Sequence, residues 1–197
     1  TIVTFSDKEG TPWDSTSFAQ RLTQQPGAFF SLVDLDNNGS LDLLLSDGEI
    51  FLSKPHGVFL ALAPSPHLQL ASVAGVNQNG RLDVLGLLDG RPTRLANHGA
   101  KNYRWQTIRT RAANAHGDQR INSFGIGGEI EIRAGLLAEK QIITIPVLHF
   151  GLGEQQGVDL ARIVWPNGLV QAEFELNGNQ SILATQRLKG SCPSLFA

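Results

Sequence analysis

The chain has 197 residues, of which 41% are hydrophobic and 17% are charged, and this balance excludes a disordered chain. Its net charge of -2 gives no support to nucleic-acid binding, and its single cysteine, Cys192, excludes an internal disulfide. No apolar run approaches the ~20 residues that a membrane helix needs, and the absence of methionine predicts a segment of a longer protein.

The charge is divided unevenly along the chain. Residues 1–97 carry 6 basic and 10 acidic side chains, whereas residues 98–197 carry 10 and 8. The basic half contains a group of closely spaced arginines: Arg104, Arg109, Arg111 and Arg120. They form either a polyanion site or an ordinary solvated surface, and the second interpretation is favoured.

Short apolar runs separated by turn residues predict β-strands in the first half of the chain. These runs cover residues 2–5, 28–33, 41–45, 58–62, 68–73 and 82–88. One short helix is expected at residues 15–24, with Asp14 as its N-cap and with Pro26 and Gly27 ending it.

The first half also contains an internal repeat. VDLDNNGSLDLLL at 33–45 aligns with AGVNQNGRLDVLG at 74–86, so Asp42 corresponds to Asp83 at an offset of 41 residues. This period is typical of a small sheet repeated as a propeller blade. Two copies do not close a propeller, which needs about four blades. Either further blades precede this segment or the two copies pack as an open sheet.

Residues 104–190 predict a compact antiparallel β-domain, best described as a sandwich. The predicted strands include 128–133, 158–165 and 171–176. The first and last of these alternate between apolar and polar residues, so each should have one buried and one solvated face. Pro166, Asn167 and Gly168 are expected to form a turn after the middle strand.

A loop rich in oxygen ligands lies between the two strands of the first repeat. Loop positions 1, 3, 5, 7 and 9 hold the candidate ligands: Asp34, Asp36, Asn38, the backbone carbonyl of Ser40, and Asp42. Gly39 permits the sharp bend. This ligand set suits Ca²⁺ better than Mg²⁺, which prefers a tight octahedron that retains several waters.

The loop is not an EF-hand, because position 12 is Leu45 instead of a bidentate glutamate and the following residues favour a strand. A modest calcium affinity is therefore expected. The alternative is a metal-free turn, since Asp, Asn and Gly are common turn formers. In the second copy Gly75 and Asn77 replace the two leading acids, and a structural turn is expected there.

The loop and its repeat resemble the FG-GAP/VCBS repeats of integrin-like β-propellers. The resemblance lies in the pattern Asp34-x-Asp36-x-Asn38-Gly39-x-Leu41-Asp42 and in its degenerate copy at 75–83, and residues 95–97 look like the closing strand of a blade. It implies that residues 1–97 are a partial, propeller-like β-repeat region, in which calcium stiffens the blade.

The second half resembles the ASPIC/UnbV domain, which commonly follows such repeats. The matching stretches, in the expected order, are Trp105, 120–127, 149–153, 158–159, 165–168 and 179–180. The resemblance implies a domain at 104–190 within an exported multidomain protein, and residues 191–197 look like a link to a further region. It supplies no reaction.

Candidate catalytic groups are scattered along the second half. His149 lies in a stretch, HFGLG, that is expected to form a tight turn, and His116, Asp118 and Arg120 are expected to lie in a solvated loop. Trp105 and Trp165 are expected to be packing aromatics, with a sugar-binding platform as the alternative. No zinc-ligand spacing or nucleophile elbow is present in the sequence.

The sequence thus predicts a non-enzymatic, calcium-stabilised binding or scaffold segment of a larger exported protein, secreted to the extracellular space or periplasm. Its expected partner is a protein or glycan of the cell surface or extracellular matrix. Two alternatives remain. One is an enzyme or enzyme subunit with a polar cleft in the ASPIC/UnbV domain, formed by His116, Asp118, Arg120 and His149. The other is a carbohydrate-binding module.

Overall fold

The computed structural model describes a set of segments: residues 2–4, 14–16, 27–54, 58–99, 101–112 and 121–187. Every regular element in these segments is a β-strand, so the predicted all-β class is confirmed. Within them, the structure contains no helix of the length and hydropathy that a membrane crossing requires.

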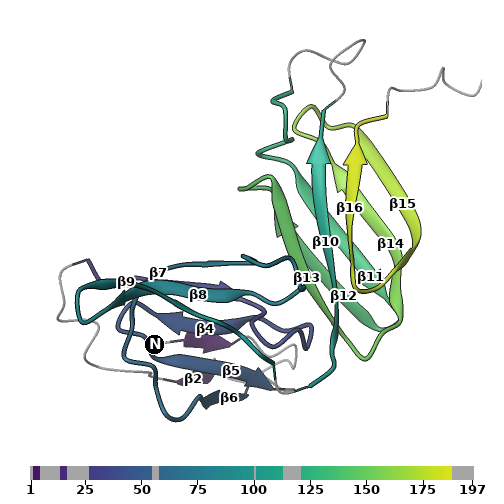
Figure 1. The fold of residues 1–197 in the computed structure, drawn as a ribbon. Helices are drawn as coiled ribbons and strands as arrows, with labels where there is room; N and C mark the ends of the chain where they lie inside the picture. The colour runs from purple at the N-terminus through teal and green to yellow at the C-terminus, as the bar shows by residue number, and fades with distance from the viewer. Residues whose placement is uncertain are drawn as a thin grey trace, which may run out of the picture. The chain divides into compact units, whose positions relative to one another are not determined.

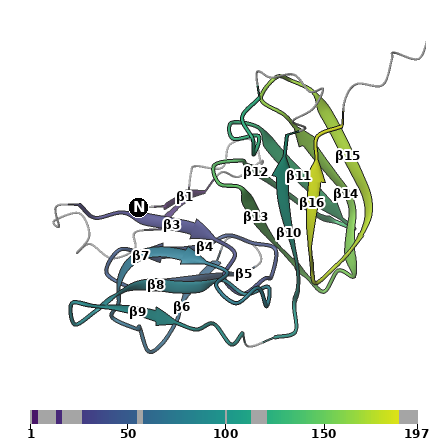
Figure 2. The same ribbon diagram turned by 45° about the horizontal axis from the view of Figure 1, so that its top comes forward.

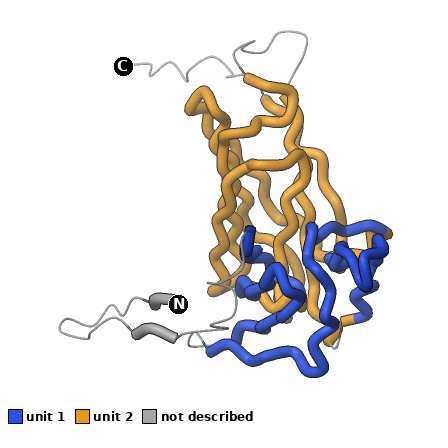
Figure 3. The backbone as a smooth tube through the Cα atoms, turned by 90° about the vertical axis from the view of Figure 1, so that its left-hand side faces the viewer, with its two compact units in different colours: residues 1–35, 40–76, 82–98 blue, residues 36–39, 77–81, 99–197 orange. Residues whose placement is uncertain are grey.

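The chain divides into two compact units, coloured separately in Figure 3. The first unit comprises residues 1–35, 40–76 and 82–98, and the second comprises residues 36–39, 77–81 and 99–197. Two short stretches, 36–39 and 77–81, therefore belong to the second unit although they interrupt the sequence of the first. The predicted boundaries at 97 and 104 stay predictions.

The first unit is built from antiparallel strands (Figure 1). One sheet has the order β3 (Phe30–Val33), β4 (Asp42–Leu45), β5 (Ile50–Lys54) and β6 (Val58–Ala61). A second has the order β7 (Gln69–Ala74), β8 (Asp83–Leu88) and β9 (Arg91–Leu95), and β1 (Ile2–Thr4) pairs with β2 (Asp14–Thr16). The sequence predicted most of these strands but neither β2 nor β5.

The internal repeat is preserved in the backbone of two hairpins. Val33 pairs with Asp42 in the first, and Ala74 pairs with Asp83 in the second. Both turns use left-handed backbone at the same two places: Asn37 (φ 62°) and Gly39 (φ 85°) in the first, Gln78 (φ 55°) and Gly80 (φ 75°) in the second. The shared turn conformation explains why a glycine stands at the same position of both copies.

The core of the first unit lies between its two larger sheets. It consists of buried aliphatic side chains: Leu35, Leu44, Ile50, Leu68, Leu70 and Val84. The backbone at Gly48 approaches the backbone at Leu68 closely, since a Cβ added at Gly48 would lie 2.4 Å from the carbonyl oxygen of Leu68. A backbone hydrogen bond of 3.0 Å from Leu70 to Ser46 also joins the two sheets.

The second unit is a sandwich of two sheets (Figure 2). One sheet has the order β13 (Val147–Gly153), β10 (Arg104–Arg111) and β16 (Gln180–Thr185). The other has the order β12 (Leu137–Ile142), β11 (Glu129–Ala134), β14 (Gly157–Val164) and β15 (Val170–Asn177). Side chains from both sheets form one core, and Ile108, Phe150, Ile130, Ile132 and Ile163 are fully buried in it. The predicted sandwich is therefore observed.

The alternation of apolar and polar residues correctly predicted the buried and exposed faces of β11 but not those of β15. In β11, Ile130 and Ile132 are fully buried while Arg133 is exposed. In β15, however, Phe174 is 66% exposed and Gln171 is buried. The prediction for 171–176 was wrong because Gln171 pairs with the fully buried Ile163 and so faces the core, whereas Phe174, three residues further on, lies on the opposite face of the strand.

Three further expectations differ from the structure. Ser15 and Thr16 lie in β2 and not in a helix, and the rest of the predicted 15–24 helix lies outside the described residues. The stretch 149–153 continues strand β13 to Gly153 and is not a tight turn. Finally, β16 pairs with β10 in parallel, so the sandwich is not purely antiparallel.

The sandwich core should tolerate truncation far less than its edge. Phe150→Ala removes a fully buried ring and is expected to lower the free energy of unfolding by about 3–5 kcal/mol. Phe174→Ala removes an exposed ring and should change it by less than about 0.5 kcal/mol. Urea unfolding of both variants measures the difference, and equal losses would contradict the assignment of the core.

Candidate metal site

The turn between β3 and β4 gathers three carboxylates. Asp34, Asp36 and Asp42 each offer an oxygen, and these oxygens all lie within 4.8 Å of one another. Asp34 is 3% exposed and Asp42 is fully buried, whereas Asp36 is half-buried. Carboxylates at this separation repel one another, and their oxygens are of the kind that could hold a cation.

Asp42 also holds the hairpin together. One carboxylate oxygen accepts the N–H of Leu35 at 2.8 Å and the other accepts the N–H of Ser53 at 2.7 Å. Leu35 lies in the turn and Ser53 in β5, so the Asp42 side chain connects the start of β4 to the turn and to β5.

The remaining turn residues are placed as a sharp loop requires. The backbone N–H of Asn38 donates to Asp36 Oδ1 at 3.1 Å, which closes a local turn around that carboxylate. Asn38 is half-buried and Ser40 is exposed. The three acids converge as predicted; the side chain of Asn38 and the carbonyl of Ser40 stay predictions as ligands.

Asn37, between the candidate ligands, makes contacts that the sequence did not indicate. Within the second unit its Nδ2 donates to the carbonyl of Gly80 at 2.8 Å, and its Oδ1 lies 2.7 Å from Nε2 of His149. Its own carbonyl accepts the N–H of Gly153 at 2.8 Å. The bond to Gly80 orients the amide, so His149 must donate from Nε2.

His149 is therefore a structural histidine, held neutral by its surroundings. Its ring stacks with that of Trp105, with centroids 6.4 Å apart and an interplanar angle of 17°. Burial lowers the pKa of His149 from 6.5 to about 4. Trp105 also covers Gly80, where an added Cβ would lie 1.8 Å from the indole ring. Both aromatic rings act in packing.

The structure describes only one of the four residues of the alternative catalytic cleft, and that alternative stays a prediction. His149 lies in β13 as above, while His116, Asp118 and Arg120 fall outside the described residues. Trp165 is buried, and its Nε1–H donates to Gln171 at 3.2 Å. The expectation that Trp165 is a packing aromatic is thus confirmed.

The second repeat turn has a different charge pattern. Asp83 is fully buried, and one of its oxygens accepts the N–H of Asn97 at 2.9 Å. The other oxygen accepts from the guanidinium of Arg94, at 3.1 Å from Nε and 2.8 Å from an Nη. A structural turn was expected here, and the contacts of Asp83 given above are hydrogen bonds to other groups of the protein.

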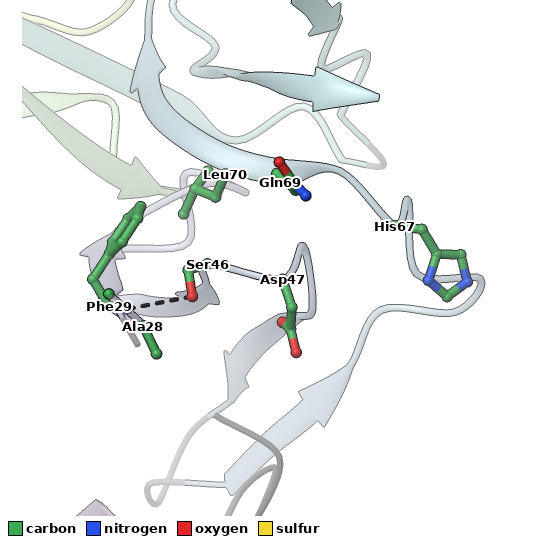
Figure 4. Close-up of a pocket in the computed structure, with 8 residues that line it drawn as sticks. Ala28, Phe29, Ser46, Asp47, His67, Gln69 and Leu70 are labelled. Carbon is green, nitrogen blue, oxygen red and sulfur yellow. Dashed lines mark hydrogen bonds between the residues drawn. The ribbon is translucent and has the colours of Figure 1, made fainter. Parts of the chain in front are cut away.

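A depression of about 510 Å³ in the first unit contains no arrangement of reactive groups (Figure 4). Its lining includes Phe29, whose N–H donates to the Ser46 hydroxyl at 3.3 Å. The imidazole of His67 points away from Ser46 and Asp47 in this view. Asp47 accepts the N–H of Glu49 at 3.2 Å, as in an ordinary turn.

The site and the fold define the chain as an all-β protein with a carboxylate-rich hairpin turn and a β-sandwich. Residues 117–190, in the sandwich, match the family model described as ASPIC and UnbV. That part of the predicted resemblance is confirmed, over less than half of the chain. No curated protein matches the chain.

Acid should destabilise the protein through His149. Above pH 6.5 the imidazole is neutral in both the folded and the unfolded chain, so it has no effect on stability. Below pH 6.5 the unfolded chain binds a proton that the folded chain does not bind until about pH 4. Stability should therefore fall over this range by about 3 kcal/mol from this group.

Urea unfolding at a series of pH values measures this loss. His149→Gln should remove that part of the pH dependence, whereas His98→Gln, at an exposed histidine, should keep it. An unchanged pH dependence in the His149 variant would show that the fold does not lower the pKa of this ring.

Proposed function

We propose that the chain is a calcium-stabilised, non-catalytic binding or scaffold segment of a larger exported protein. The observation that carries the proposal is the convergence of Asp34, Asp36 and Asp42, whose ligand oxygens lie within 4.8 Å of one another. Hard oxygen donors of this kind suit Ca²⁺. Neutralising them would stabilise the hairpin.

Calcium in this setting is a structural ion. Asp42 already connects the turn to β5 through Leu35 and Ser53, so an ion held by the same carboxylate would stiffen the whole hairpin. Asp34, Asp36 and Asp42 would hold it, with Asn38 and the Ser40 carbonyl completing the shell. The ion supplies no reaction in this proposal.

The resemblance of residues 1–97 to FG-GAP/VCBS repeats supports a role in recognition. The two hairpins share their register and their left-handed turn positions, as copies of one repeat should. With the ASPIC and UnbV match in the sandwich, this favours an exported protein that is extracellular or periplasmic. Its partner would be a protein or glycan of the cell surface or matrix.

Calcium should raise the melting temperature of the full chain. For a dissociation constant of about 10⁻⁴ M, about 2 mM calcium adds about 2 kcal/mol to the free energy of unfolding. Scanning calorimetry with calcium and with a chelator measures the shift. Equal melting temperatures under the two conditions would remove the calcium part of the proposal.

A matched pair of variants locates the effect. Asp36→Asn removes one ligand charge but keeps an oxygen for the N–H of Asn38, and it should abolish most of the calcium shift. Asp47→Asn changes an aspartate that accepts the N–H of Glu49 in another turn, and it should leave the shift intact. Calcium shifts that are reduced equally in both variants would place the ion elsewhere.

A further inference from the structure

The two repeat turns share their register but direct the same carboxylate differently. Asp42 and Asp83 both stand at the start of the second strand of their hairpin. Asp42 accepts the N–H of Ser53 in the third strand, and Asp83 accepts the N–H of Asn97 just after the third strand. The pairs Leu43–Phe51 and Val84–Leu95 make Ser53 and Asn97 equivalent in register. The first carboxylate oxygen therefore has the same role in both copies.

The second oxygen distinguishes the copies. In the first repeat it accepts the N–H of Leu35, a residue of the turn itself. In the second repeat it accepts two N–H groups from the guanidinium of Arg94, which lies in β9. The Asp83 carboxylate is thus turned to the third strand, whereas Asp42 is turned to its own loop.

Arg94 has no counterpart of its kind in the first copy. It pairs with Leu85, as Ile50 pairs with Leu44, so Ile50 is the equivalent residue. Ile50 is buried in the apolar core. An arginine at this position of the third strand is therefore specific to the second repeat.

The other oxygens of the second turn are engaged locally. The N–H of Asn79 donates to Asn77 Oδ1 at 3.3 Å, and the N–H of Arg81 donates to Asn79 Oδ1 at 3.0 Å. Gly75 supplies no ligand at the position of Asp34. The second turn has one carboxylate in place of three, and that carboxylate carries its own ion pair.

We propose that Arg94 is the built-in cation of the second repeat, which anchors Asp83 without a metal ion and makes the calcium site of the first turn unique to that copy. A buried carboxylate is strongly destabilising unless it is paired and hydrogen-bonded. The guanidinium of Arg94 does both, because two of its N–H groups donate to one oxygen of Asp83. The comparison with calcium rests on the function proposed above, but the role of Arg94 does not.

Melting of the full chain in chelator tests the role of Arg94 independently of calcium. Arg94→Gln should lower the melting temperature by about 5 °C or more. Arg91→Gln, at another exposed arginine of the same strand that has no bond to Asp83 in the described residues, should not. Equal melting temperatures of these two variants would overturn the proposal.

A double variant covers the case in which Arg94→Gln does not fold. Asp83→Asn removes the buried charge and retains an oxygen for the N–H of Asn97, so Asp83→Asn with Arg94→Gln should be more stable than Arg94→Gln alone. A double variant that is no more stable than the single one would show that Arg94 does not neutralise Asp83.

Calorimetric titration with calcium tests the division between the copies. The natural chain should bind one ion, and none after Asp36→Asn. A chain with Gly75→Asp, Asn77→Asp and Arg94→Ile, which reproduces the first turn, should bind two. Two ions bound by the natural chain would overturn the proposal, as would one ion in the triple variant. No binding by the natural chain would instead defeat the calcium function and leave the Arg94 result standing.

Discussion

Burial of a carboxylate at the start of the second strand of a hairpin is the constraint around which the first unit is built. Such a group destabilises the fold by several kcal/mol unless hydrogen bonds and opposite charge compensate it. Asp42 and Asp83 are both fully buried, and each accepts a backbone N–H from Ser53 in β5 or from Asn97 just after β9. Each aspartate thus ties the start of the second strand to the end of the third, which gives the residue the same role in both copies.

The second unit is stabilised in another way. Its sandwich core is almost wholly apolar, with branched aliphatic side chains and the rings of Phe150 and Trp165 packed between two sheets. In the edge strand β15, the side-chain Nε2 of Gln171 donates a hydrogen bond of 3.0 Å to the backbone carbonyl of Thr185. Side-chain bonds of this kind connect the edges of the two sheets, which no backbone ladder joins.

Much of the fold could be predicted because it depends on local patterns. Alternation placed β11 and its buried face correctly, and the 41-residue repeat predicted equivalent hairpins with equivalent aspartates. The convergence of Asp34, Asp36 and Asp42 also followed from spacing around one glycine bend. The errors fell where contacts with other strands decide which face is buried: in β15 the polar Gln171 faces the core, and Phe174 is 66% exposed on the other face.

The sequence by itself determined the all-β class, the repeat and the three acids of the first turn, because each is set by residues a few positions apart. Only the tertiary structure decided that the glycine-rich stretch ending at Gly153 extends a strand, that β16 joins β10 in parallel, and that His149 is a neutral partner of Asn37. These outcomes depend on contacts between residues distant in the sequence. The backbone hydrogen bonds of a strand, and the burial of its side chains, depend on which distant segment lies beside it, and local sequence patterns do not identify that segment.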